Sequence, residues 1–133
     1  MANRGIIWIK LSENSKNDLV WFVGQEFPVL YADHVTLAFK VFESDYADMV
    51  GKRVDFVATE ADKNGDIQAV RVRLPDWIKG ENRIPHITVS AREGVPPNNS
   101  NQMYQTGQFE ARSLVDGLEL TGVVEFFEFN NRA

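Results

Sequence analysis

The chain has 133 residues, 44% of them hydrophobic and 25% charged, which suits one domain with its own core and argues against disorder. The formal net charge of −5 excludes a broad basic surface of the kind that binds duplex nucleic acid non-specifically. The absence of cysteine excludes disulfides, thiolate zinc sites and a cysteine nucleophile. Only two histidines are present, so they are the first candidates for acid–base chemistry near neutral pH.

The first half of the chain predicts two strands and two short helical segments. β-Branched and aromatic residues over 5–11 and 34–41 are typical of strands. The turn-forming run 12–15 indicates a helix start, and the apolar run 18–23 that follows it fits either a helix or a strand. Residues 43–50 predict one or two helical turns.

The second half is dominated by strands. The strand-like runs share β-branched and apolar residues and are 53–59, 67–74, 84–90 and 118–129. The dipeptide Asn64-Gly65 between the first two runs is the signature of a tight antiparallel hairpin. Residues 94–101 form a turn-rich loop, in which Ser100 or Asn101 is placed to cap a short helical turn.

These elements predict a single α+β domain over residues 1–133. Strands outnumber helices and the hairpin implies antiparallel pairing, while no linker or low-complexity tract divides the chain. The apolar run 6–9 is followed at once by Lys10 and is too short for a signal peptide or a membrane span. We therefore expect a cytoplasmic protein with no membrane partner.

Both histidines begin the same local pattern. The stretches read His34-Val-Thr-Leu-Ala-Phe-Lys and His86-Ile-Thr-Val-Ser-Ala-Arg, so each is His, β-branched, Thr, aliphatic, small, apolar and basic. Side chains alternate between the faces of a strand, so each histidine shares a face with the threonine two residues on, Thr36 or Thr88. A lone histidine or threonine in a strand is usually an ordinary packing residue. The duplicate uses both histidines of the chain and therefore points to function.

This arrangement suits the chemistry of a phosphodiester. Two imidazoles facing each other can act as one general base and one general acid, because their reference pKa of about 6.5 is near the operating pH. One takes a proton from water and the other protonates the departing oxygen, while Thr36 and Thr88 hold the non-bridging oxygens. A metal site built from the histidines and a carboxylate such as Asp33 leaves the threonines without a role, so no metal is expected.

The paired H-x-T motifs resemble those of the 2H (two-histidine) phosphoesterase superfamily. The stretch that begins at His34 is similar to the first motif of the cyclic phosphodiesterase domain of fungal tRNA ligases and related RNA-repair proteins. Residues 85–101, with Pro-His-Ile-Thr-Val-Ser, Gly-Val-Pro and Ser-Asn, are similar to the second motif and its loop. The resemblance covers about residues 34–101. It implies a compact 2H-like fold, with antiparallel strands and short helices around a central cleft.

The resemblance also implies an activity, which is metal-independent hydrolysis of 2′,3′-cyclic phosphate or related phosphodiester ends, with no cofactor. His34, Thr36, His86 and Thr88 would be the catalytic set, with His86 as the base and His34 as the acid. The partner would be an RNA terminus or a small cyclic nucleotide. Two alternatives remain: hydrolysis of a cyclic oligonucleotide signal, and a binding module of the same fold that holds a phosphate without turning it over.

Other residues are assigned from their positions alone. Ser90 follows Thr88 on the same strand face and is a candidate phosphate ligand. Trp77 and Tyr104 lie in predicted loops and are candidates for stacking a nucleobase. Trp8 lies in the first strand and is most simply a core residue.

Overall fold

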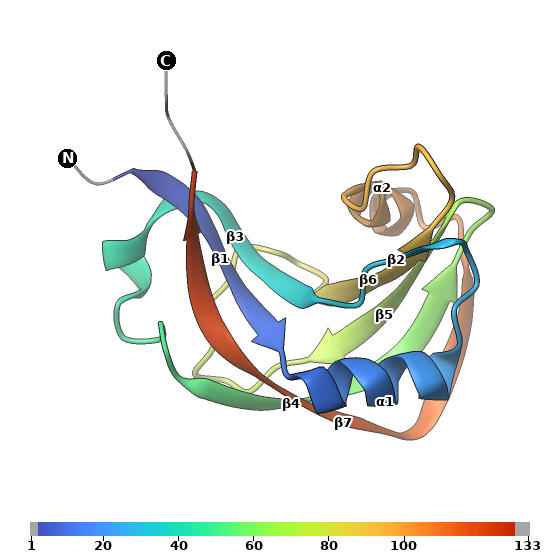
Figure 1. Cartoon of the computed structure of the whole chain (residues 1–133), viewed down its shortest axis with the longest axis horizontal. Coiled ribbons are helices and arrows are strands. Elements are labelled where there is room, and N and C mark those ends of the chain that lie inside the picture. Colours follow the sequence, from blue (N-terminus) through green and yellow to red (C-terminus); the bar gives the residue numbers. More distant parts are fainter. Residues whose placement is uncertain (1–2, 130–133) are drawn as a thin grey trace.

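The structure is a computed structural model in which residues 3–129 are described. These residues form an α+β domain, as the sequence predicts (Figure 1). In chain order the elements are β1 (Arg4–Leu11), α1 (Glu13–Val23), β2 (Val29–Leu30), β3 (His34–Phe42), the 3-10 helix η1 (Glu43–Tyr46), β4 (Arg53–Lys63), β5 (Ile67–Arg73), β6 (His86–Ala91), α2 (Asn99–Thr106) and β7 (Glu110–Glu128).

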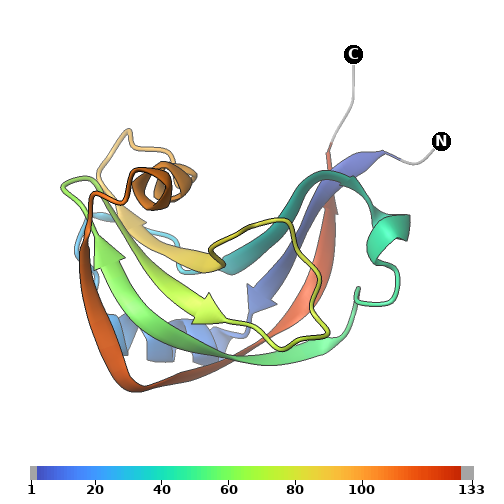
Figure 2. The same ribbon diagram turned by 180° about the vertical axis from the view of Figure 1, so that it is seen from behind.

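The strands form one closed antiparallel barrel. Its order is β6-β3-β1-β7-β4-β5, and β5 pairs back with β6 to complete the ring of six strands. The short β2 extends the sheet beside the far end of β6, where Leu30 pairs with Ser90. The predicted antiparallel pairing is confirmed for every described strand pair. Figures 1 and 2 show α1 along one side of the barrel and α2 over β6 on the opposite side.

Alternation along the strands fills the barrel with aliphatic side chains. In β1, Ile7 and Ile9 are fully buried, whereas Ile6 and Trp8 point outward and are only partly covered. The buried core residues of the other barrel strands include Val35, Leu37, Val54, Phe56, Val70, Val72, Ile87, Val89, Leu120 and Val124. Burying one such aliphatic side chain contributes about 1.5–3 kcal/mol, so this shared core holds the ring closed.

The run 18–23, which the sequence left between helix and strand, belongs to helix α1. Ser12 is its N-cap, and the Ser12 hydroxyl oxygen accepts the backbone N–H of Ser15 at 3.1 Å. Leu19 is fully buried in the barrel core, while Trp21 is 87% exposed. One strongly buried position in three turns explains why periodicity alone could not identify the helix.

Two connections between elements can be compared with the turns that the sequence predicts. The predicted hairpin is confirmed, because the Asn64 N–H donates to the Ile67 carbonyl at 3.1 Å and Asn64 Oδ1 accepts the N–H of Asp66 at 2.8 Å. The predicted helical turns over 43–50 shorten to η1, which follows Phe42 and has no side-chain cap.

Strand β7 begins at Glu110, well before the predicted start at residue 118. Residues 110–113 are exposed and contain no large apolar side chain, so they carry no alternating pattern that sequence analysis could detect. They are held in the strand by pairing with the end of β4. Asp116 and Gly117, with φ of 64° and 70°, bend the strand at this point, and the two halves follow different parts of the barrel.

Gly122 offers a test of how tightly β7 fits between its neighbours. It pairs with Leu11 on one side and Val54 on the other, and an added Cβ would meet the Lys10 carbonyl oxygen and lie 2.7 Å from Ile9 Cγ2. We expect Gly122→Ala to lower the free energy of unfolding by about 1–3 kcal/mol, measured by urea titration.

The matched control is Gly65→Ala, because a Cβ at Gly65 meets nothing within 4 Å. Its free energy of unfolding should stay within about 0.5 kcal/mol of the parent. Equal effects of the two substitutions would contradict this account of the packing.

Candidate active site

One register pair brings the two H-x-T motifs together. Val35 of β3 pairs with Ile87 of β6, and both side chains are fully buried in the barrel core. The residues on either side of each therefore point to the outer surface of the barrel. Because the strands are antiparallel, His34 is set beside Thr88. By the same register the histidine of β6 lies beside the threonine of β3, at a cross-strand separation of about 5 Å.

The sequence suggested two imidazoles that face each other. In the structure the two motifs instead lie side by side on neighbouring strands of the barrel, β3 and β6. The four residues His34, Thr36, His86 and Thr88 line a single pocket of about 480 Å³. Side chains of β1 and β3 form one of its borders, and the segment that begins α2 forms the other. Figure 1 shows α2 above β6. The H-x-T residues thus share one concave site.

The neutral ring of His86 is held in one tautomer. Its Nδ1 lies 2.7 Å from the Ile84 carbonyl oxygen, which can only accept, so Nδ1 carries the hydrogen. In the neutral ring Nε2 then accepts from the Ser100 hydroxyl at 2.9 Å. Burial lowers the pKa of His86, the Ile84 hydrogen bond opposes that shift, and the Arg71 charge adds to it. The imidazole is therefore poised to accept a proton.

Ser100 is a site residue whose role sequence analysis missed. It is 1% exposed, and its hydroxyl oxygen lies 2.9 Å from His86 Nε2 and 2.8 Å from Thr88 Oγ1. With the Ser100 hydrogen directed to His86, the Thr88 hydroxyl can donate to Ser100 in turn. The sequence marked Ser100 only as a possible helix cap, and Asn98 holds that position.

His34 is covered by an aromatic ring. Trp8 stacks on it with ring centroids 4.3 Å apart, so Trp8 lines the pocket and is not the core residue that the sequence suggested. Burial lowers the pKa of His34, and the Asp33 carboxylate opposes this. The charges of Lys10 and His86 add to the lowering, which means that the two imidazoles are close enough to influence each other.

Two further candidates, Ser90 and Trp77, do not reach the pocket. Ser90 is fully buried, donates to Gln68 Oε1 at 2.6 Å and accepts the Phe27 N–H at 3.1 Å, because the segment before β2 covers this end of β6. Trp77 is 44% exposed in its loop, with the Lys52 ammonium 5.9 Å from its ring. Neither residue lines the pocket that holds the H-x-T motifs.

Tyr104 lies behind His86 in a buried polar cluster. It is 7% exposed, its ring centroid lies 4.8 Å from that of His86, and its hydroxyl donates to Asp62 Oδ2 at 2.6 Å. Burial, followed by the Glu60 carboxyl, raises the pKa of Asp62 to about 7. Arg71, which pairs in register with His86, lies 3.7 Å from Glu60. Tyr104 thus packs behind the candidate site, and little of its ring is available to a base.

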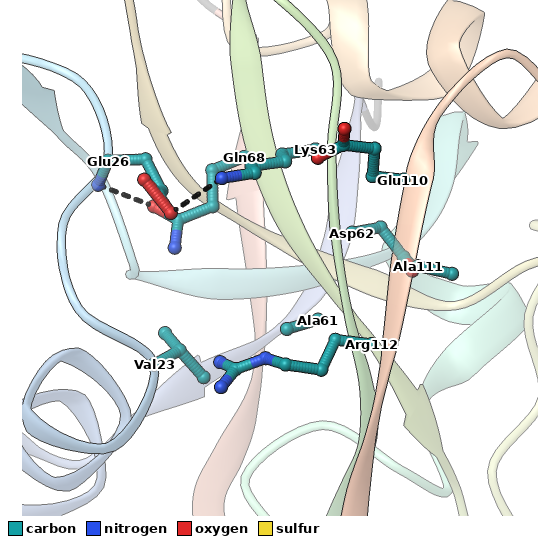
Figure 3. Close-up of a pocket in the computed structure, with 9 residues that line it drawn as sticks. All are labelled: Val23, Glu26, Ala61, Asp62, Lys63, Gln68, Glu110, Ala111 and Arg112. Atoms are coloured by element: carbon teal, nitrogen blue, oxygen red, sulfur yellow. Dashed lines mark hydrogen bonds and ion pairs between the residues drawn. The ribbon is translucent and has the colours of Figure 1, made fainter.

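A second cavity, of about 600 Å³, lies away from both histidines (Figure 3). It is bounded by the end of α1 and by β4, β5 and β7. Its charges partly neutralise one another, since Lys63 pairs with Glu26 at 3.0 Å. The Glu26 N–H donates to Gln68 Oε1 at 3.2 Å, as Figure 3 also shows. None of the H-x-T residues contributes to this cavity.

No protein-family model matches the sequence, and no significant match is found among curated proteins. Within residues 3–129, no helix is long and apolar enough to cross a membrane. The same residues contain no group of three or more histidine and carboxylate side chains positioned to hold a metal ion.

The His86–Ser100 hydrogen bond predicts a specific titration behaviour. Both histidines should titrate below their ordinary pKa of 6.5, because burial disfavours the charged ring. Replacing Ser100 with alanine removes the hydrogen-bond partner of His86 Nε2, so the pKa of His86 should shift while that of His34 does not. Ring nitrogen NMR against pH measures both histidines in one spectrum, with His34 as the internal reference. An unchanged His86, or equal shifts of the two rings, would argue against this bond.

Asp62 predicts a pH dependence of stability. Its pKa in the folded state is about 7 and its ordinary value is 3.8, so the folded chain keeps a proton that the unfolded chain releases. The stabilising contribution is complete below pH 3.8 and is lost as the pH rises through 7. Asparagine cannot ionise, so Asp62→Asn should gain stability relative to the parent as the pH rises.

Urea titrations at several pH values between 4 and 8 measure this difference. The matched control is Asp18→Asn, which makes the same substitution at an exposed position on α1. A stability difference between Asp62→Asn and the parent that does not change with pH would contradict the raised pKa of Asp62.

Proposed function

We propose that this protein is a metal-independent phosphodiesterase that opens 2′,3′-cyclic phosphate ends of RNA or cyclic nucleotides. The observation that carries the proposal is the Val35–Ile87 pair, on whose outer side two identical H-x-T motifs meet in one pocket. Two imidazoles and two hydroxyls in one concave site are the groups that this reaction needs. The α+β barrel would then be a compact version of the 2H fold.

In the proposed reaction His86 is the general base. Its Nε2 lone pair takes a proton from water, directly or through the Ser100 hydroxyl, as the water oxygen forms a bond to phosphorus. One ribose oxygen leaves as the bond from phosphorus to that oxygen breaks, and protonated His34 supplies its proton. The two imidazoles exchange protons with solvent before the next turnover.

The threonines act on the phosphate itself. Thr36 and Thr88 flank the histidines on the same outer face and can donate hydrogen bonds to the non-bridging oxygens, on which negative charge grows in the transition state. Thr88 already forms a hydrogen bond to Ser100, at 2.8 Å, so its side chain is held in position before substrate arrives. Its hydroxyl has one hydrogen, which would turn from Ser100 to the phosphate when the substrate binds.

The second candidate is a module that binds a phosphate without hydrolysing it. The observation that favours it is the position of Ser100, which already occupies His86 Nε2 and is 1% exposed. If Ser100 kept water away from His86, the pocket would hold an anion but have no active base. The remaining alternative, a hydrolase of cyclic oligonucleotides, would use the same groups on another substrate. Assaying a panel of substrates distinguishes it.

The deciding experiment is hydrolysis of 2′,3′-cyclic nucleotides in the presence of a chelator. We expect the parent to be active, and His34→Ala or His86→Ala to lower kcat/KM by at least about 100-fold, because each removes one proton-transfer group. Trp21→Ala, at a remote exposed position on α1, serves as the control and should retain full activity. Thermal unfolding of each variant checks that the barrel is intact.

Other outcomes separate the alternatives. Activity that disappears with chelator, or that survives both alanine substitutions, would overturn the mechanism. Tight binding of a cyclic nucleotide with no product formed would favour the binding module. Hydrolysis restricted to cyclic oligonucleotides would assign the second substrate class.

A further inference from the structure

We infer that an aromatic surface beside the pocket binds the unpaired nucleotides upstream of the cyclic phosphate, so that the substrate is a single-stranded oligonucleotide end and not a mononucleotide. This aromatic surface consists of Trp8, Phe39 and Phe127 on the outer side of β1, β3 and β7, and of Phe129, which directly follows β7. The inference rests on the proposed function and names the substrate class of the same site. Nothing in the H-x-T motifs themselves indicates how far the substrate extends.

The aromatic surface begins at a histidine of the site. Trp8 stacks on His34 at 4.3 Å and on Phe127 at 5.4 Å, with interplanar angles of 30° and 29°. Phe39, which also borders the pocket, packs edge-on against Phe129 at 5.3 Å. One pair of rings therefore continues from His34, and the other begins at the border of the pocket.

Strand register explains why these rings lie together. Ile6 of β1 pairs with Phe39 on one side and with Phe127 on the other, which sets three apolar side chains in one row across three strands. Adjacent strands are about 4.8 Å apart, so the row is roughly 10 Å wide. Trp8 lies in the next row, paired with Thr36, and connects the aromatic surface to the phosphate site.

The outer rings are unusually exposed for their size. Phe39 is 54% and Phe127 is 55% exposed, although both belong to regular strands whose inner faces are buried. A single exposed apolar side chain is common, but a contiguous set beside a polar site is typical of a binding surface. Flat rings accept stacked bases of any sequence, so they suit an unpaired strand.

The charges around the aromatic surface are suited to a short nucleic-acid segment. The Lys40 ammonium lies 5.7 Å from the Phe39 ring, and Arg4 donates to the Lys40 carbonyl at 2.9 Å. Among the described residues neither cation forms an ion pair, so both can attract phosphates. Glu125 lies on the opposite border, where it accepts the Trp8 indole N–H at 3.3 Å. The sugar–phosphate chain would follow the Lys40 side.

The overall charge limits the length of this segment. With a net charge of −5, the protein cannot attract a long polyanion along its whole surface. Two cations and one row of rings match a few nucleotides next to the cyclic end. This combination of rings, cations and continuity with the site favours an oligonucleotide over a second copy of the chain, which would need no cations at this border.

The test compares two substrates that have the same reacting group. One is a 2′,3′-cyclic mononucleotide, and the other is a single-stranded tetranucleotide that ends in the same cyclic phosphate. We expect kcat/KM to be at least tenfold higher for the tetranucleotide. Phe127→Leu removes the flat ring but keeps an apolar side chain, and should reduce that ratio about tenfold, the size expected for one lost stacking contact.

Two matched variants separate stacking from general damage. Phe127→Tyr retains the ring and should restore the preference for the tetranucleotide. Trp21→Leu removes an aromatic ring that is even more exposed, at 87%, but lies on α1, and should leave the ratio unchanged. Thermal unfolding confirms that all three variants remain folded.

The outcomes distinguish this inference from the proposed function. Hydrolysis of both substrates at equal efficiency, or a ratio that Phe127→Leu does not change, overturns the aromatic surface as a nucleotide site and leaves the proposed activity intact. If neither substrate is hydrolysed, the proposed activity fails. In that case the binding of a labelled tetranucleotide with a 3′-phosphate, measured by anisotropy, tests the aromatic surface alone. The inference then requires that the tetranucleotide binds and that Phe127→Leu weakens this binding. A dimer in sedimentation that Phe127→Leu dissociates would also overturn the inference.

Discussion

The pairing of Val35 with Ile87 is the contact on which the site depends. Within residues 3–129 it is the only register pair between β3 and β6, and it closes the barrel at the point where the two H-x-T motifs begin. The buried aliphatic residue in the middle of each motif anchors its strand in the core, and the polar residues on either side are thereby turned outward. The packing that stabilises the fold and the alignment of the site are therefore the same interaction.

Burial of the residues in and behind the site shifts their pKa values. Burial lowers the pKa of both imidazoles and so favours neutral rings, one of which would have to be protonated to act as the acid of the proposed reaction. On the other side of His86, burial raises the pKa of Asp62, which keeps a carboxyl neutral close to Arg71. This part of the barrel therefore contains several partly desolvated polar groups. Hydrogen bonds such as the one from Tyr104 to Asp62 keep these groups ordered.

Chain segments far from the motifs complete the site. Ser100 lies on α2 and forms hydrogen bonds with both His86 and Thr88, although 14 and 12 residues separate it from them along the chain. Trp8 arrives on β1 and covers His34. Strand β1 lies beside β3 in the barrel, so the pocket border and the aromatic surface both follow from strand order. The surroundings of the four motif residues are thus properties of the closed barrel.

The sequence by itself determined the α+β class, the antiparallel pairing, the hairpin at Asn64 and the matching polarity of the two motifs. These features are local, since turn chemistry and the alternation of side chains along a strand can be read within about ten residues. Tertiary structure alone decided that Ser90 is covered, that Ser100 bonds to His86 and that Trp8 faces the pocket. Strand neighbours and register are set by which apolar faces close the barrel. That choice depends on contacts between distant parts of the chain, and no local pattern contains it.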